Sequence, residues 1–214
     1  MLKVGRFGLQ AFVAEDVRQD VVPKTGPTFL SKTTGNLAKK FHESMPSYQP
    51  TPLVHLSALA QELGVTGIYV KDESARFNLN AFKVLGSSYA MGKFICRRLG
   101  LDEKTVTFDD LQSEEVGRQI GEVIFVTATD GNHGRGVAWT AKQLGQKAVV
   151  YLPKDVAMRR VQAIEETGAT AIVTDVNYDD TVRLAKEAAE KNGWCLIQDT
   201  AWDGYEDIPR WIME

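Results

Sequence analysis

Between residues 123 and 198 the chain alternates short apolar runs with longer amphipathic stretches. The apolar runs predict strands at 123–127, 147–152, 170–174 and 194–198, and the stretches between them predict helices at about 133–144, 155–167 and 178–192. This alternation predicts an α/β fold in which a parallel, twisted sheet carries helices on both faces. Ligands of such sheets bind at the carboxyl ends of the strands, where residues 130–136 and 199–203 fall.

The pattern before residue 123 is weaker. Residues 1–50 carry scattered Pro, Gly and Lys, and we expect them to be mostly irregular with short pieces of structure. The segments expected after them are an extended entry at 50–53, a short helix at 57–63 closed by Gly64, a strand at 67–71, a helix from about 81 to 99 ended by Gly100, and a charged surface excursion with one helix at 101–121.

The bulk properties are those of an ordinary globular protein. The chain has 214 residues, of which 43% are hydrophobic and 25% charged, and its formal net charge is -3. No basic block and no stripe of Lys and Arg interleaved with aromatics occurs, so nucleic acid is not an expected partner. No apolar stretch approaches the length of a membrane span, and charged residues interrupt any signal-peptide core after Met1. We therefore expect a cytoplasmic protein that does not enter a membrane.

The few cysteines and histidines do not suggest a metal site. Cys96 lies in a helix-like run and Cys195 in a strand-like run, as expected of small core residues in a reducing compartment. The histidines at positions 42, 55 and 133 lack the spacing of a zinc cluster.

The segment 129–136, with the sequence TDGNHGRG, is the most informative part of the chain. It joins the strand at 123–127 to an apolar helix, and its small residues leave backbone N–H groups free to face a ligand at the positive end of that helix. The glycines do not form the G-x-G-x-x-G fingerprint, which argues against a nicotinamide cofactor. Upstream, Lys83 begins another apolar helix. An aldehyde cofactor needs an amine that forms an imine and donors for its ring substituents. A lysine at the start of a helix can supply the amine, and a polar glycine turn can supply the donors.

Lys83 has an ordinary interpretation as a solvated helix lysine. The neighbouring Phe82, Val84 and Leu85 instead suggest an apolar environment, and the positive first turn of a helix disfavours a charged amine. Both effects favour the uncharged amine that attacks an aldehyde.

Three stretches resemble the fold-type II pyridoxal-phosphate (PLP) enzymes, which include threonine dehydratases, cysteine synthases and the tryptophan synthase β chain. They are KDESARFNLNAFKVLGSSYA at 71–90, TATDGNHGRGVAW at 127–139 and QDTAWDGYEDIPRWIM at 198–213. Within that group the chain is most similar to the diaminopropionate ammonia-lyases, chiefly through Asp130 and the run 198–213. The resemblance extends from about residue 50 to the last residue. It implies a tryptophan synthase β-like fold, PLP as cofactor, and a homodimer when the chain is full length.

The resemblance also implies roles for single residues. Lys83 would hold PLP as an imine, with Phe82, Gly131 and Asn132 in the cofactor site; the matching asparagine of relatives contacts the ring hydroxyl, although a helix N-cap is an alternative role for Asn132. The histidine that follows, at position 133, is structural in this family. Asp130 would remove the α-proton of the D-isomer while Lys83 serves the L-isomer, although Asp-Gly is also a common turn pair.

Asp199, at the end of the strand 194–198, would be a second carboxylate for a substrate with two ammonium groups, with a strand-end cap as its alternative role. The implied reaction is elimination of 2,3-diaminopropionate, a small amino acid, to pyruvate and ammonia in amino-acid catabolism. Threonine or serine dehydratase-like activity is the runner-up.

One feature of the family is missing from this chain. Fold-type II enzymes hold the PLP phosphate in a Gly-rich loop from their C-terminal half, and no two glycines are adjacent here. We therefore expect an N-terminal portion with the C-terminal half missing: residues 1–82 as the leading part of the large PLP domain, 83–200 as the small α/β domain, and 201–214 as a return toward the large domain. The alternative of a different class is a non-catalytic fragment that folds but lacks cofactor and activity.

Overall fold

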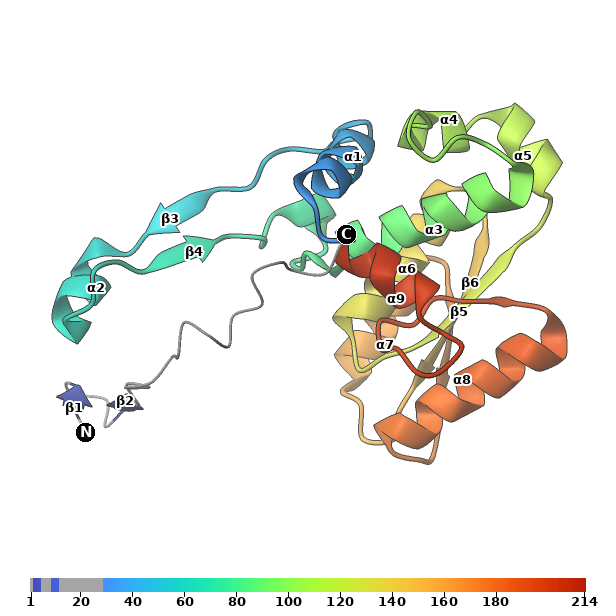
Figure 1. Ribbon diagram of the computed structural model, residues 1–214. Helices are drawn as coiled ribbons and strands as arrows, with labels where there is room; N and C mark the ends of the chain where they lie inside the picture. The colour runs from blue at the N-terminus through green and yellow to red at the C-terminus, as the bar shows by residue number, and fades with distance from the viewer. Residues whose placement is uncertain (1, 5–8, 12–28) are drawn as a thin grey trace.

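The computed structural model describes residues 2–4, 9–11 and 29–214 and shows an α/β domain with a long hairpin that extends away from it (Figure 1). The first described segments, β1 (Leu2–Val4) and β2 (Leu9–Ala11), form an antiparallel pair. Among these described residues no helix has the length and apolar character needed to cross a membrane. Most of the 1–28 portion, for which irregular structure is expected, lies outside the described residues.

A four-stranded sheet forms the centre of the α/β domain. Its order is β7-β6-β5-β8, and every pairing between neighbours is parallel, as the sequence pattern predicts. The strands are β5 (Ile124–Ala128), β6 (Lys147–Leu152), β7 (Thr170–Val173) and β8 (Cys195–Leu196). β8 ends before the predicted residue 198 because the backbone N–H of Gln198 donates to the Tyr205 hydroxyl at 2.8 Å instead of to a strand.

Helices cover both faces of the sheet, which confirms the predicted fold class. Helix α8 (Tyr178–Asn192) packs on the face that carries Val126 and Ala128. The opposite face carries Phe125 and belongs to the larger core cluster, with α6 (Asn132–Gln143) and α7 (Met158–Glu165).

Helix α7 begins at Met158 and not at the predicted residue 155. The backbone of Asp155 has φ +66°, a left-handed conformation that no α-helix continues through.

The long helix α3 (Lys83–Leu99) crosses α6 in direct contact. Gly136 of α6 lies at the crossing, and a Cβ atom added there would come within 2.9 Å of the Val84 Cα atom and 3.0 Å of the Val84 backbone nitrogen. Glycine at this position therefore lets the backbones of two helices touch at the first turn of α3. The crossing fixes the place of Lys83 relative to the turn that precedes α6.

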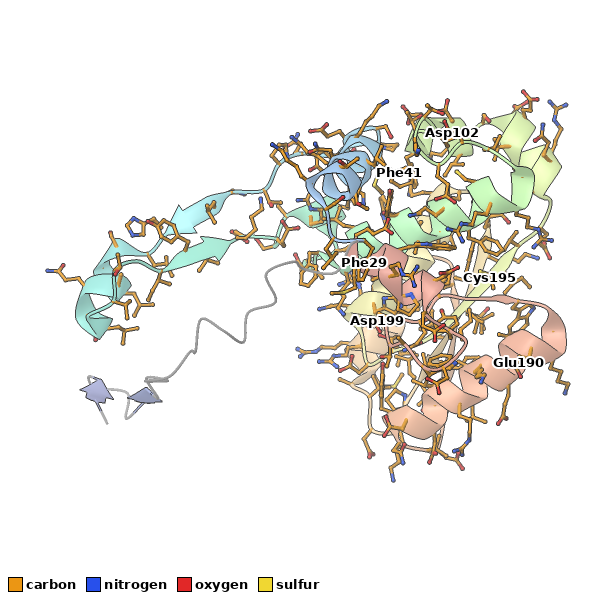
Figure 2. All side chains as sticks on the ribbon, viewed as in Figure 1. Phe29, Phe41, Asp102, Glu190, Cys195 and Asp199 are labelled. Carbon is orange, nitrogen blue, oxygen red and sulfur yellow. The ribbon has the colours of Figure 1, made fainter. Side chains whose placement is uncertain are left out.

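Helix α1 (Lys32–Glu43) lies in the N-terminal region for which mostly irregular structure is expected. Its buried residues are Ala38 and Phe41, and Phe41 lies against Gly92 of α3; Figure 2 labels Phe41 between the two helices. Polar residues and Gly35 make up its first half, and its apolar residues are only Leu37, Ala38 and Phe41. Tertiary packing on α3, and not local propensity, stabilises this helix.

The charged excursion after α3 contains two helices, α4 (Phe108–Leu111) and α5 (Glu114–Ile120), where one is predicted. The Thr107 side chain caps α4 in a capping box with Asp110, and Ser113 caps α5. A last helix, α9 (Asp207–Met213), packs on α3 near the C-terminus (Figure 1).

The projecting hairpin consists of β3 (Leu53–His55), α2 (Ser57–Leu63) and the antiparallel partner β4 (Tyr69–Lys71). The predicted helix at 57–63 is confirmed, and it ends at Gly64 with φ +68°. At the base of the hairpin the buried Arg76 donates to Glu73 at 2.8 Å and to the Gln49 carbonyl at 2.8 Å. This network anchors the hairpin to the segment that leads into α3.

That segment has an unusual backbone. A 3-10 turn, η2 (Arg76–Asn78), is followed within five residues by Lys83, and three non-glycine residues have left-handed φ values: Phe77 at +46°, Asn78 at +59° and Asn80 at +53°. Such conformations cost free energy in L-residues and occur often next to functional sites.

Substitution of Asn80 measures this strain. Its side chain is exposed, so Asn80→Ala removes little packing but places a Cβ-bearing residue of poorer left-handed tolerance in the turn. We expect Asn80→Ala to lower the free energy of unfolding by about 1 kcal/mol and Asn80→Gly to leave it unchanged or slightly raised. Urea unfolding of both variants checks the result, and equal effects of Ala and Gly would contradict it.

Candidate active site

The residues singled out in the sequence meet at the carboxyl end of the sheet. The turn after β5, the segment after β8 and the start of α3 line a cavity of about 200 Å³. Its lining residues are Lys83, Thr129, Asp130, Gly131, Asn132, His133, Arg160, Tyr178 and Asp199. Figure 2 labels Asp199 on the side of the α/β domain nearer the hairpin. The structure therefore brings Lys83, Asp130, Gly131, Asn132 and Asp199 to one cavity.

Phe82 lies elsewhere. Its side chain is 59% exposed, and it lines a second cavity of about 400 Å³ on the other side of Lys83. Lys83 and Asp199 line both cavities, so the lysine lies between them.

Thr129 organises the turn before α6. Its hydroxyl accepts hydrogen bonds from the backbone N–H groups of Gly131 at 3.0 Å and Gly134 at 3.2 Å. A Cβ atom on Gly134 would lie 2.3 Å from the Thr129 methyl group, so only glycine allows this arrangement. The N-cap of α6 is Gly131, and Asn132 is the first residue of the helix, with an exposed side chain. The alternative role of Asn132 as the N-cap is therefore wrong.

Lys83 is the first residue of α3, and its amine makes an ion pair. Its Nζ atom donates to Oδ2 of Asp199 at 2.7 Å. The lysine side chain is 40% exposed, so the apolar enclosure expected from Phe82 and its neighbours is wrong. Phe82 turns toward solvent because it is the N-cap of α3 and lies outside the packed face of the helix. The carboxylate of Asp199, and not an apolar wall, is the main neighbour of the amine.

His133 is buried behind this pair. Its Nε2 lies 2.8 Å from the Ile197 carbonyl, which accepts a hydrogen bond and assigns the proton to that nitrogen. Burial lowers the pKa of His133, and this effect outweighs the opposing effects of Asp199 and the Ile197 carbonyl. Nδ1 then faces Asp199 at 3.8 Å and the Ser87 hydroxyl at 3.4 Å. His133 thus fixes the backbone of the strand end that carries Asp199, as its predicted structural role requires.

The carboxyl group of Asp199 stays ionised in this environment. Burial acts to raise its pKa, but His133 and Lys83 outweigh burial, and the pKa lies below its ordinary value. A carboxylate that is charged at neutral pH attracts a cationic amine, whether that amine belongs to Lys83 or to a ligand.

Tyr178 lines the cavity and the fully buried Gln198 lies behind it, and neither is found by sequence reasoning alone. Gln198 is fully buried, and its Oε1 accepts from the Thr127 hydroxyl at 3.1 Å and from the Ala128 backbone N–H at 3.0 Å. Its Nε2 lies 3.1 Å from the Tyr178 hydroxyl. Burial raises the pKa of Tyr178, so the phenol that accepts this hydrogen bond stays neutral. The signal in the sequence was a polar amide at the end of an apolar strand.

Asp130 points away from the buried groups. Its side chain is 76% exposed, and its Oδ2 lies 3.6 Å from a guanidinium nitrogen of Arg160. Arg160, in the first turn of α7, is another lining residue that the sequence did not reveal.

The groups present fit the reactive end of PLP. A lysine amine suits its aldehyde, and the exposed side-chain amide of Asn132 suits a ring substituent. Within residues 29–214 and the two short N-terminal strands, no cluster of three or more His, Cys, Asp or Glu side chains is placed to hold a metal ion. An amine paired with one carboxylate, in a cavity that a second carboxylate also lines, can exchange protons with a bound amino acid and neutralise its ammonium groups.

Comparison with known proteins extends this picture. Residues 45–213 match the model of the pyridoxal-phosphate dependent enzyme family. The chain is 53% identical over 192 residues to the diaminopropionate ammonia-lyase of Escherichia coli K12, an alignment that covers 89% of this chain and 47% of that protein. It is 28% identical over 152 residues to a catabolic L-threonine dehydratase of Staphylococcus aureus, covering 71% of this chain and 37% of that protein.

The crystal structure of the Escherichia coli diaminopropionate ammonia-lyase in its apo form aligns with a TM-score of 0.82 at 52% identity, covering 87% of this chain and 50% of that chain. These matches confirm the resemblance carried by the three sequence stretches. The chain spans about half the length of the ammonia-lyases that it matches.

Proposed function

The chain belongs to the pyridoxal-phosphate-dependent enzyme family, and from this membership we propose that it carries the lysine and carboxylates of a diaminopropionate ammonia-lyase. The observation that carries the proposal is that Lys83, Asp130 and Asp199 line one cavity. The chain that folds around this cavity is 52% identical in sequence to such an enzyme over the aligned region. The reaction is elimination of the β-amino group of 2,3-diaminopropionate followed by hydrolysis, so that one water is consumed and pyruvate and two molecules of ammonia are released.

Lys83 is the residue proposed to hold PLP, and Asn132 and Gly131 are proposed to contact its ring, supported by their place in the lining of the same cavity. When bound, PLP supplies an electron sink that stabilises negative charge at the substrate α-carbon. Lys83 is supported in this role by its place between the two cavities and beside the glycine turn. The Asp199 carboxylate, 2.7 Å from its Nζ atom, orients the amine.

Asp130 and Lys83 are the proposed proton acceptors for the two isomers. The α-proton of the D-isomer goes to the carboxylate of Asp130, and that of the L-isomer goes to the amine of Lys83. The β-amino group then leaves as ammonia. Both residues line the cavity, which supports two separate acceptors around one substrate position.

The ionised Asp199 favours a substrate with an additional ammonium group. Transfer of a cation into a partly buried site is unfavourable unless an opposite charge offsets its lost hydration. Threonine and serine lack that second ammonium group, so this site is expected to prefer diaminopropionate over both.

The assembly and the domain division are further proposals. We retain the homodimer, the cytoplasmic location and the domain boundaries at residues 82 and 200 as predictions from the family resemblance. Hydrodynamic measurement of the purified protein checks the first of these.

Product assays test the proposed function. The purified protein is incubated with PLP and either D- or L-diaminopropionate, threonine or serine, and the oxo acid is measured with lactate dehydrogenase. Pyruvate from diaminopropionate at the highest rate supports the ammonia-lyase. A preference for threonine would indicate a dehydratase. Absence of any product, together with absence of a borohydride-stable PLP adduct, would indicate the non-catalytic fragment.

Asp130→Asn tests the division of labour between the two acceptors. The amide keeps the shape of the side chain but cannot accept the proton, so we expect kcat/KM for the D-isomer to fall by about a hundredfold or more. The value for the L-isomer should fall by less than about tenfold, since Lys83 remains. Steady-state kinetics with each pure isomer give both values, and equal losses would remove the two-acceptor proposal.

A further inference from the structure

Arg160 makes two kinds of contact with the turn that carries Asp130. Its Nη1 atom donates to the Asp130 backbone carbonyl at 2.6 Å and lies 3.6 Å from Oδ2 of the same residue. The aliphatic part of its side chain lies over Gly131, where an added Cβ atom would meet the Arg160 Cδ atom at 3.4 Å. The Arg160 side chain therefore hydrogen-bonds to the backbone of the turn, pairs with the Asp130 carboxylate and packs over Gly131.

The location of Arg160 is electrostatically unfavourable for the helix that carries it. Helix α7 has no acidic residue in its first turn and no side-chain N-cap, and Arg160 adds a positive charge where the helix already presents unpaired N–H groups. When a charged residue stands where the helix dipole disfavours its charge, a favourable contact outside the helix can offset that cost. The contact here is with Asp130, in the chain segment that follows β5.

The relative strengths of these contacts indicate what Arg160 does. The side chains of Arg160 and Asp130 are 47% and 76% exposed, so their ion pair contributes little to stability. The short hydrogen bond from a charged guanidinium to a main-chain carbonyl is the stronger contact, and it restrains the backbone of the turn. Its effect is on the direction of the Asp130 side chain and not on the stability of the fold.

We propose that Arg160 is a positioning residue that holds the Asp130–Gly131 turn and thereby sets the preference between D- and L-isomers. The proposal rests on the proposed function, in which Asp130 accepts the α-proton of the D-isomer. With Arg160 in place, the backbone of the turn is restrained, and with it the position of the Asp130 carboxylate beside the cavity that it lines. Without it, the backbone of the turn and the carboxylate sample several directions, and the D-isomer reaction loses its acceptor for part of the time.

Arg160→Met isolates the contact. Methionine keeps the unbranched stem over Gly131 but has no N–H donor and no charge. Arg159→Met is the matched control, because Arg159 is the preceding residue of the same helix and is exposed. Thermal unfolding of both variants is expected to match that of the parent protein, which separates a positioning effect from loss of fold.

Hydrogen exchange gives a readout that does not require activity. The backbone N–H groups of Gly131 and Gly134 are bonded to Thr129 within the turn, so their exchange reports its opening. In the purified 214-residue chain, Arg160→Met should speed exchange in the peptide that spans 129–136 by about threefold or more, and Arg159→Met should not. Unchanged exchange in Arg160→Met would overturn the proposal.

Kinetics with pure isomers test the consequence. In Arg160→Met the ratio of kcat/KM for the D-isomer to that for the L-isomer should fall by about tenfold, through kcat of the D-isomer. A rise in KM of equal size for both isomers would overturn the proposal, since it would mean that Arg160 binds the α-carboxylate common to them. If the parent protein turns over neither isomer, the proposed function fails by itself, and the exchange measurement still decides whether Arg160 holds the turn.

Discussion

Replacement of Lys83 by alanine is expected to abolish covalent attachment of PLP and to lower turnover of diaminopropionate by about a thousandfold or more. The physical reason is that the Nζ atom of Lys83 is the amine that lines both cavities at the carboxyl end of the sheet. No other lysine lines the cavity of the glycine turn within the described residues. Borohydride reduction with PLP, followed by mass spectrometry of the peptide containing residue 83, measures attachment directly.

A control lysine separates the site from general reaction of surface amines with PLP. Lys142 lies in α6 and is exposed, so Lys142→Ala should leave attachment at Lys83 unchanged. Circular dichroism of Lys83→Ala should match that of the parent protein, since the lost ion pair is part-exposed. Stoichiometric reduced adduct that persists in Lys83→Ala on a different single lysine would show that the assignment is wrong.

Replacement of Gly136 by alanine is expected to lower the free energy of unfolding by about 1–3 kcal/mol. The added methyl group would lie 2.9 Å from the Val84 Cα atom, and a backbone atom of a packed helix cannot move aside as a side chain can. This cost exceeds the gain in helix propensity, which is at most about 1 kcal/mol. Because α3 must shift at its first turn, attachment of PLP to Lys83 should weaken as well.

Gly117→Ala is the matched control for this steric effect. Gly117 also lies inside a helix, α5, but nothing comes within 4 Å of a Cβ atom placed there. Only the propensity gain applies, and stability should be unchanged or higher by up to about 1 kcal/mol. Urea unfolding of both variants gives the comparison, and similar changes in the two proteins would mean that the crossing of α3 and α6 tolerates a larger residue.

The α/β part of the fold follows from the sequence because its signals are local and strong. Each strand from 123 onward is a continuous apolar run, as expected when both faces of a sheet are covered, and the intervening helices end at residues such as Gly193, where φ is +68°. Since parallel strands end at the same edge, the placement of Asp130 and Asp199 near each other also follows from the pattern. The confirmed elements are those in which periodicity, caps and topology agree.

Other features depend on packing between distant segments, which a single sequence does not display. Helix α1 is stable because Phe41 packs on Gly92, a contact between residues with no local relation. The exposure of Lys83 depends on which way α3 enters the domain, and apolar neighbours in sequence did not predict it. Arg160 was missed for the same reason, because its partner lies 30 residues earlier in the chain.

The buried Gln198 side chain links separate segments around the cavity by hydrogen bonds. Its single amide joins the end of β5, through the Ala128 N–H, to the Tyr178 hydroxyl of α8, while its own backbone leads directly into Asp199. A ligand that displaces one of these groups therefore breaks hydrogen bonds to the others. The inner side of the cavity is thus braced from behind by Gln198, whereas its exposed side depends on the contact between Arg160 and the Asp130 turn.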